Sequence, residues 1–170
     1  MIVLQYAAFM FFPLAMAYAA VSDLLSMTIS NKVSLILIVG FLAIAPFAPG
    51  MDLETFGLHL AAGAIVLAVS FFMFGFGLIG GGDAKIAAAA SMWIGLGLAI
   101  EFMAWTAIIG GGVTIVVLVM RQRVSASFAV RYTWLYRLHD PASGVPYGIA
   151  LAAAALLIYP DSIWINLVVS

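Results

Sequence analysis

Two aspartates, Asp23 and Asp83, are the side chains of this chain whose type and position could do chemistry. Asp83 ends the run Gly80-Gly81-Gly82-Asp83, and Asp23 follows the first long apolar segment. A carboxylate beside hydrocarbon is costly, which makes it a candidate functional residue, and glycines let another chain approach closely. Two carboxylates that share a water can divide the base and acid roles of peptide hydrolysis. The pair therefore points to aspartyl chemistry.

Each of these residues also has a structural explanation. Asp is an ordinary N-cap, and carboxylates at helix ends often lie among lipid headgroups, so either aspartate alone favours that explanation. The presence of both on one face, beside the glycines, reverses the preference. Lys85 could pair with a carboxylate or a lipid phosphate, or it could serve only as a positive anchor at the membrane surface.

The composition places the chain in lipid. Of its 170 residues, 66% are hydrophobic and 8% are charged, and the mean hydropathy is +1.25, far from the values of soluble domains. The apolar runs lack the alternation of barrel strands, so an all-α polytopic membrane fold is expected. The net charge of -1 and the lack of a basic surface exclude nucleic acid as an expected partner. The chain has no cysteine, and His59 and His139, both expected at the membrane interfaces, lie on opposite faces, so neither a metal site nor a cofactor is predicted.

Six transmembrane helices are predicted, because one span needs roughly 20 apolar residues. Their ranges are 2–22, 33–49, 56–76, 83–100, 102–120 and 147–169, within a single membrane-embedded domain of residues 1–170. Pro46 and Pro49 predict an irregular end for the second span, and Glu101 is expected at a tight junction between the fourth and fifth spans.

Small residues mark where these helices are expected to pack. Ala19 lies one turn before Asp23, and Ala87 lies one turn after Asp83. Since small side chains let membrane helices approach each other, the first and fourth helices are expected to meet at the aspartates. The three glycines at 110–112 are expected to form a packing notch in the fifth span.

The charges give the predicted spans a direction. One side carries all six basic residues, namely Lys32, Lys85, Arg121, Arg123, Arg131 and Arg137. The other side carries Asp52, Glu54, Glu101 and Asp161. Because basic residues stay in the cytoplasm, the N-terminus is expected outside and the loops at 23–32, 77–84 and 121–146 inside. Both candidate aspartates then share the cytoplasmic face.

Three separated segments resemble the type IV prepilin peptidase family. The sequence GGGDAK at 80–85 resembles the GxGD motif of that family. SDL at 22–24, followed by ISNK at 29–32, resembles its first aspartate motif, and PYGIA at 146–150 resembles the segment that opens its last helix. The length resembles the short form found in Flp, or tight-adherence, pilus systems.

The resemblance implies an aspartic endopeptidase of the bacterial cytoplasmic membrane, which removes a short basic leader from a prepilin at the cytoplasmic face. Asp23 and Asp83 take the catalytic positions, and Gly80, Gly82 and Lys85 belong to the active-site loop. The expected partners are membrane lipid and the prepilin, with its leader and hydrophobic helix; no cofactor is implied. Some larger relatives also methylate the new N-terminus, but they carry a cysteine-containing region that has no counterpart here.

Two features depart from the family pattern without removing an aspartate. Ser30 stands where a proline is expected, and the segment LLSM at 24–27 replaces the usual basic residues after Asp23. Three other functions stay open at this point. One is a presenilin-like intramembrane GxGD protease, although this chain has no Pro-Ala-Leu element. The others are a small proton-coupled transporter that uses the Asp pair as a relay, although no internal repeat is found, and a non-catalytic assembly subunit.

Overall fold

The structure, a computed structural model, describes the backbone of residues 2–169 and the side chains of residues 5–125, 128–140 and 142–168. Every regular element in that part of the chain is helical, which confirms the all-α class. The α-helices are α1 (Ile2–Ser26), α2 (Asn31–Ile44), α3 (Leu53–Gly75), α4 (Gly81–Ile94), α5 (Leu96–Arg123), α6 (Ala126–Ala129), α7 (Thr133–His139), α8 (Tyr147–Ile158) and α9 (Asn166–Val169). Short 3-10 helices lie at η1 (Ala45–Phe47), η2 (Pro141–Ser143), η3 (Tyr159–Asp161) and η4 (Ile163–Ile165).

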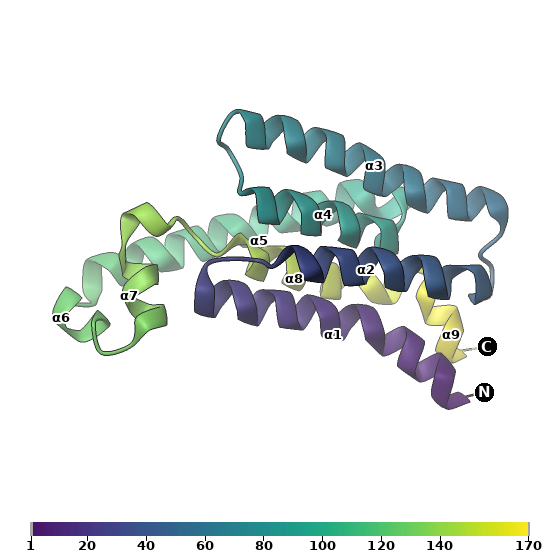
Figure 1. Ribbon diagram of the computed structural model, residues 1–170, viewed down its shortest axis with the longest axis horizontal. Coiled ribbons are helices and arrows are strands. Elements are labelled where there is room, and N and C mark those ends of the chain that lie inside the picture. The colour runs from purple at the N-terminus through teal and green to yellow at the C-terminus, as the bar shows by residue number, and fades with distance from the viewer. Residues whose placement is uncertain (1, 170) are drawn as a thin grey trace.

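The helices form an elongated antiparallel bundle with two distinct ends (Figure 1). The end of α1, the starts of α2, α4 and α8, and the end of α5 lie together with α6 and α7; we call this the α7 end. The two chain termini lie at the opposite end, which we call the terminal end. All six basic residues occupy the helix ends and loops of the α7 end, as predicted, and Asp52, Glu54, Glu101 and Asp161 lie toward the other end. Asp23, Asp83 and Asp140 lie with the basic residues.

The helices differ in length more than six equal spans would. Among the described residues, three helices are long and apolar enough to cross a membrane, over Gln5–Ser26, Leu53–Gly75 and Leu96–Arg123. The segments Asn31–Phe47 and Tyr147–Asp161 are shorter apolar helices. Helix α4 has 14 residues, and at 1.5 Å per residue it rises only about 20 Å. The bundle thus combines long and short helices.

The break between the fourth and fifth helices lies at Gly95 and not, as expected, at Glu101. Gly95 has a φ of 86°, a conformation that glycine adopts without steric cost and other residues rarely do. Helix α4 therefore ends at Ile94 and α5 begins at Leu96, which leaves Glu101 inside α5. Gly95 ends α4 because it adopts a positive φ that breaks the helical backbone. Glu101 places no such demand on the backbone, so the helix continues through it.

Two other predicted spans have different bounds. The predicted sixth span is interrupted, because α8 ends at Ile158 and Pro160 lies in the following 3-10 helix; a proline supplies no N–H to continue the α-helix. The first span continues to Ser26, four residues beyond its expected end. The irregular end predicted for the second span is confirmed, since Pro46 lies in η1.

Helices α4 and α8 lie inside the bundle and are rich in buried alanine. Helix α4 packs mainly against α3 and α2, and α8 packs mainly against α5 and α1 while also contacting α4. Small side chains allow this close packing. The first and fourth helices do meet, since Phe12 of α1 stacks on Trp93 of α4, and Ala19 and Ala87 are both buried. Helix α8, however, is the main partner of α1 and also contacts α4, which was not expected.

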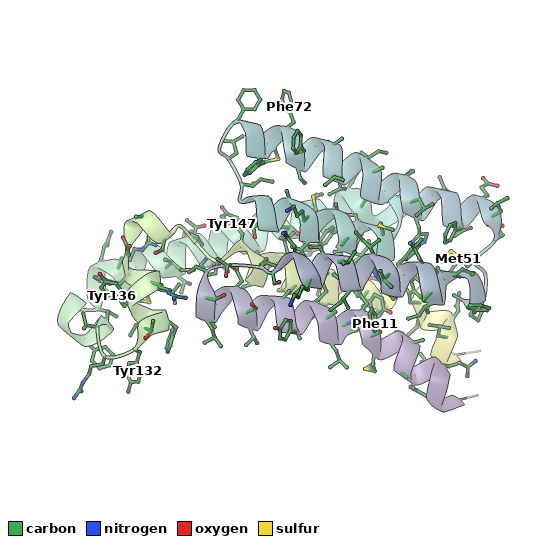
Figure 2. The ribbon with its side chains drawn as sticks, viewed as in Figure 1. Phe11, Met51, Phe72, Tyr132, Tyr136 and Tyr147 are labelled. Atoms are coloured by element: carbon green, nitrogen blue, oxygen red, sulfur yellow. The ribbon has the colours of Figure 1, made fainter. Side chains whose placement is uncertain are left out.

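The glycines at 110–112 behave differently from one another. A Cβ at Gly110 would lie 2.8 Å from Cε1 of Tyr147, so this glycine receives the Tyr147 ring, as a packing notch should. Gly111 and Gly112 have open space at the corresponding position. Tyr147 lies at the start of α8, toward the α7 end of the bundle in Figure 2. The notch predicted for this run is therefore one residue wide.

An aromatic cluster fills the half of the bundle toward the terminal end. Trp93 and Trp164 are fully buried, with ring centroids 4.6 Å apart, and Phe12 stacks on Trp93. Trp93 Nε1 donates a hydrogen bond to the Leu37 carbonyl at 2.9 Å. Trp164 Nε1 donates to the carbonyl of Trp93, near the end of α4. The Trp164 side chain thus satisfies a carbonyl that the buried end of α4 would otherwise leave unpaired, and the Trp93 side chain joins α4 to the middle of α2.

His59 belongs to this cluster and not to the membrane interface, so that expectation is wrong. Its side chain is only 5% exposed, and its Nδ1 lies 2.6 Å from the Met92 carbonyl oxygen, which can only accept. The ring stacks on Phe41. His59 is buried because it provides the end of α4 with a hydrogen-bond donor within an aromatic environment.

Candidate active site

Asp83 lies in the first turn of α4, where it holds the start of its own helix. Gly80 is the N-cap, and the Asp83 carboxylate accepts a hydrogen bond from the Gly80 N–H. This is one half of a capping box, in which the third helical residue reaches back to the N–H of the cap; the glycine cap has no side chain to make the other half. A Cβ at position 80 would lie 2.7 Å from Asp83 Oδ2. Gly80 therefore leaves the space that the Asp83 carboxylate occupies, and a larger residue at position 80 would displace this carboxylate.

Asp23 lies in the last turn of α1 and faces the interior. The helix ends at Ser26. The next residue, Met27, has a φ of 54° and donates its N–H to the Asp23 carbonyl at 2.7 Å, the geometry of a left-handed cap. The Asp23 side chain is 5% exposed. Its Oδ2 accepts a hydrogen bond of 2.7 Å from the backbone N–H of Gly148, in the first turn of α8. N–H groups in a first turn have no partner within their own helix, so they are free to bind a carboxylate.

Ile29 connects the two aspartate regions. A Cβ at Gly82 would lie 3.4 Å from the Ile29 carbonyl oxygen and 3.5 Å from its Cβ. A Cβ at Gly148 would lie 2.8 Å from Ile29 Cδ1. Ile29 therefore lies between the glycine that precedes Asp83 and the glycine that binds Asp23. The two carboxyl groups are close enough for the charge of Asp23 to act on Asp83.

The loops around the aspartates are held by hydrogen bonds from basic side chains. Lys85 Nζ donates to Asn31 Oδ1 at 2.9 Å, which joins α4 to the start of α2. Arg137 Nη1 donates to the Ser26 carbonyl at 3.2 Å, which joins α7 to the end of α1. The observed partner of Lys85 is thus the side-chain amide of Asn31 in the first motif, and this bond connects α4 to α2.

Ser30, the residue that departs from the family pattern, is the N-cap of α2. Its hydroxyl oxygen accepts a hydrogen bond from the Lys32 N–H at 3.3 Å. Serine is among the preferred N-cap residues, so it begins the helix at the position where a proline is expected. The connection between α1 and α2 therefore still ends at a capped helix start, although serine stands in place of proline.

The structure thus brings together the predicted residues Asp23, Asp83, Gly80 and Gly82, with Lys85 bound nearby. Sequence reasoning did not assign Gly148 or Ile29 to the site, although both lie in segments that carry the family resemblance. Among the described residues, no group of three or more His, Cys, Asp or Glu side chains could hold a metal ion. Two adjacent carboxyl groups can share one proton, so that one serves as base and the other as acid.

Comparison with known proteins identifies the family. The model of the type IV leader peptidase family matches residues 10–115, which is more than half of the chain. This range contains both aspartates, Ile29 and the glycine run, and it ends before α8. No curated protein and no solved structure gives a significant match. The chain therefore belongs to the type IV leader peptidase family, and both of its aspartate motifs lie within the matched residues.

Proposed function

We propose that this chain is an aspartic endopeptidase in which Asp23 and Asp83 are the catalytic pair, within one membrane domain formed by residues 1–170. Met1 and Ser170 lie outside the described residues. The observation that carries the proposal is the meeting of two carboxyl groups from different helices, with Ile29 packed between Gly82 and Gly148. A structural N-cap or a headgroup-facing carboxylate needs no second carboxylate beside it.

The chemistry follows from the two carboxyl groups. The ionised aspartate takes a proton from a bound water, which attacks the carbonyl carbon of the scissile peptide bond. The protonated aspartate then gives its proton to the leaving amide nitrogen, and the C–N bond breaks. The N–H groups of Gly80 and Gly148 hold one oxygen of each carboxylate, so the remaining oxygens are available for water and substrate.

The arrangement of charges supports a direction for the site. Both aspartates lie at the α7 end, together with the basic residues. Since basic residues stay in the cytoplasm, we place the α7 end at the cytoplasmic face of the bacterial inner membrane, and the N-terminus outside. The three long helices cross the membrane, and the shorter α2, α4 and α8 provide the other three crossings of a six-span, multi-pass protein.

A site at the cytoplasmic face suits a particular kind of substrate. A prepilin has a basic leader, which stays in the cytoplasm by the same charge rule, and an apolar helix, which lies in the bilayer. The scissile bond then reaches the aspartates at the boundary, where the backbone can leave its helix without stranding polar groups in hydrocarbon. The glycines around both aspartates favour a small residue before the cut. A prepilin of the Flp type is the proposed substrate.

The test is cleavage of a candidate Flp-type prepilin by the purified chain in lipid vesicles. Asp23→Asn and Asp83→Asn should each lower turnover by at least about 10³-fold, because the amide keeps the shape of the side chain but cannot exchange the proton. Asp52→Asn is the matched control, since Asp52 caps α3 at the terminal end by accepting the Thr55 N–H and asparagine caps equally well. Near-normal turnover by either aspartate variant would refute the catalytic pair.

The position of the cut separates the remaining alternatives. Mass spectrometry of the products should show one cut at the junction of the leader and the apolar helix. A cut several residues inside the apolar stretch would favour the presenilin-like protease. Proton-coupled transport by vesicles that show no cleavage would favour the transporter.

A further inference from the structure

The start of α8 contributes a backbone group to the proposed active site. We propose that Gly148 is a positioning residue that fixes the carboxylate of Asp23 for catalysis, an inference that rests on the proposed catalytic role of Asp23. The residues matched by the family model end at position 115, so this role is assigned from the geometry of the structure alone.

The first support is a hydrogen bond within the bundle. The Gly148 N–H donates to Asp23 Oδ2 at 2.7 Å, in a buried position, across 125 residues of sequence. Bonds from backbone N–H groups to a carboxylate are charge-assisted and are stronger than neutral ones. Because the donor belongs to a helix backbone, it cannot rotate away as a side chain would. Gly148 therefore restricts Asp23 to one orientation.

The second support is steric. A Cβ at position 148 would lie 2.8 Å from Asp23 Oδ2 and 2.9 Å from Asp23 Cβ. It would also lie 2.8 Å from Cδ1 of Ile29, the residue that packs against Gly82. No real Cβ tolerates such approaches without a shift of its neighbours. Only glycine can present its N–H to Asp23 at this distance while Ile29 stays in place.

The third support is that α5 fixes the segment before Gly148. Arg121 Nε donates to the Leu138 carbonyl at 2.7 Å, and its Nη2 donates to the Gly144 carbonyl at 2.6 Å. The ring of Tyr147 fits against Gly110 of the same helix. The N–H of Gly148 thus has a defined place relative to α5, and Asp23 is positioned from outside its own helix.

The expected consequence of a side chain at position 148 is a displaced carboxylate. A misplacement of about 1 Å can lower a rate about 10²-fold, so Gly148→Ala should lower kcat about 30- to 100-fold. The KM should stay within about twofold, because Gly148 contacts Asp23 and not the substrate. Gly112→Ala is the matched control: it makes the same change in an apolar helix, at a position where the added Cβ meets nothing within 4 Å.

A double variant distinguishes positioning from packing. Ile29→Val removes the Cδ1 that an alanine at position 148 would meet, but it leaves the close approach to Asp23 unchanged. Ile29→Val combined with Gly148→Ala should therefore recover the unfolding midpoint lost in Gly148→Ala, whereas kcat should stay low. The double variant also keeps the test valid if the single variant folds poorly.

Two results would overturn the inference. One is a kcat for Gly148→Ala within about twofold of the unmodified protein; the other is a full recovery of kcat in the double variant, which would show that packing alone was disturbed. Each result would leave the aspartate pair standing, provided that Asp23→Asn remains inactive. If Asp23→Asn were active, the proposed function itself would fail.

Discussion

The two ends of the bundle are held together by different means. The half toward the terminal end is filled by Trp93, Trp164, Phe41 and Phe12, whose rings lie in mutual contact, with indole and imidazole N–H groups satisfying backbone carbonyls. The α7 end is joined by glycine contacts around Ile29 and by hydrogen bonds from the basic side chains Lys85, Arg121 and Arg137 to the loops. Large buried rings stabilise a fold, whereas glycines leave space for another backbone.

The aromatic residues of the α7 end show the same difference. Phe72 lies near the end of α3, beside the start of α4, and Tyr132 and Tyr136 lie at and within α7 (Figure 2). Their side chains are 69%, 52% and 53% exposed, respectively. They add little to the interior, in contrast to the buried rings of the other half. The large buried rings that stabilise the fold thus lie away from the aspartates, and we expect the proposed site to admit a peptide while this aromatic cluster stays intact.

Trp93→Ala should have the largest effect on stability. Truncation of a fully buried tryptophan typically costs about 3 to 5 kcal/mol, and here it also removes the donor to the Leu37 carbonyl. Thermal unfolding in detergent should show the loss, while turnover per folded molecule should stay within about threefold of the unmodified protein. A loss of turnover in the folded fraction as large as that of Asp83→Asn would mean that the two ends are not separate.

Gly82→Leu should lower turnover more than stability, the opposite of Trp93→Ala. Its Cβ would lie 3.4 Å from the Ile29 carbonyl oxygen, which is ordinary contact, so Gly82→Ala should be nearly neutral. A leucine extends beyond this contact and should displace Ile29 or Asp83, lowering turnover about 10- to 100-fold. Kinetics and thermal unfolding of both variants test this. Full turnover of Gly82→Leu would show that the glycine is only a loop residue.

Lys85→Met should have the smallest effect. The variant keeps the aliphatic stem but loses the hydrogen bond to Asn31, which lies in an exposed position. A hydrogen bond of this kind contributes about 1 kcal/mol, so turnover should fall by less than about tenfold. Steady-state kinetics will show it. A loss as large as that of an aspartate variant would mean that Lys85 acts directly on the substrate.

The sequence was sufficient for the features that depend on local composition. The run of glycines before Asp83, the apolar segments and the position of the basic residues predicted an all-α bundle with both aspartates at one end. The break at Gly95 was missed because the chain has 16 glycines, and nothing in the sequence states which of them takes a positive φ. His59 was misplaced for a related reason: its carbonyl partner, Met92, is 33 residues away.

The role of Gly148 shows the same limit most clearly. Its segment carries the family resemblance, yet its contact with Asp23 spans 125 residues and depends on the packing of α8 against α1. The packing of α8 beside both α1 and α4 was not predicted for the same reason. Pairings of this kind follow from the tertiary arrangement and not from local spacing.

The most direct test of the account is a measurement of the proximity of positions 23 and 83. The chain has no cysteine, so Asp23→Cys combined with Asp83→Cys gives two unique thiols, and the pair Asp52→Cys with Asp83→Cys is the control across the two ends. Each single variant is first shown to react with a monofunctional thiol reagent. The account predicts that a short bifunctional reagent joins positions 23 and 83 in the folded protein and leaves the control pair unjoined. Reactive thiols at 23 and 83 that fail to join would contradict it.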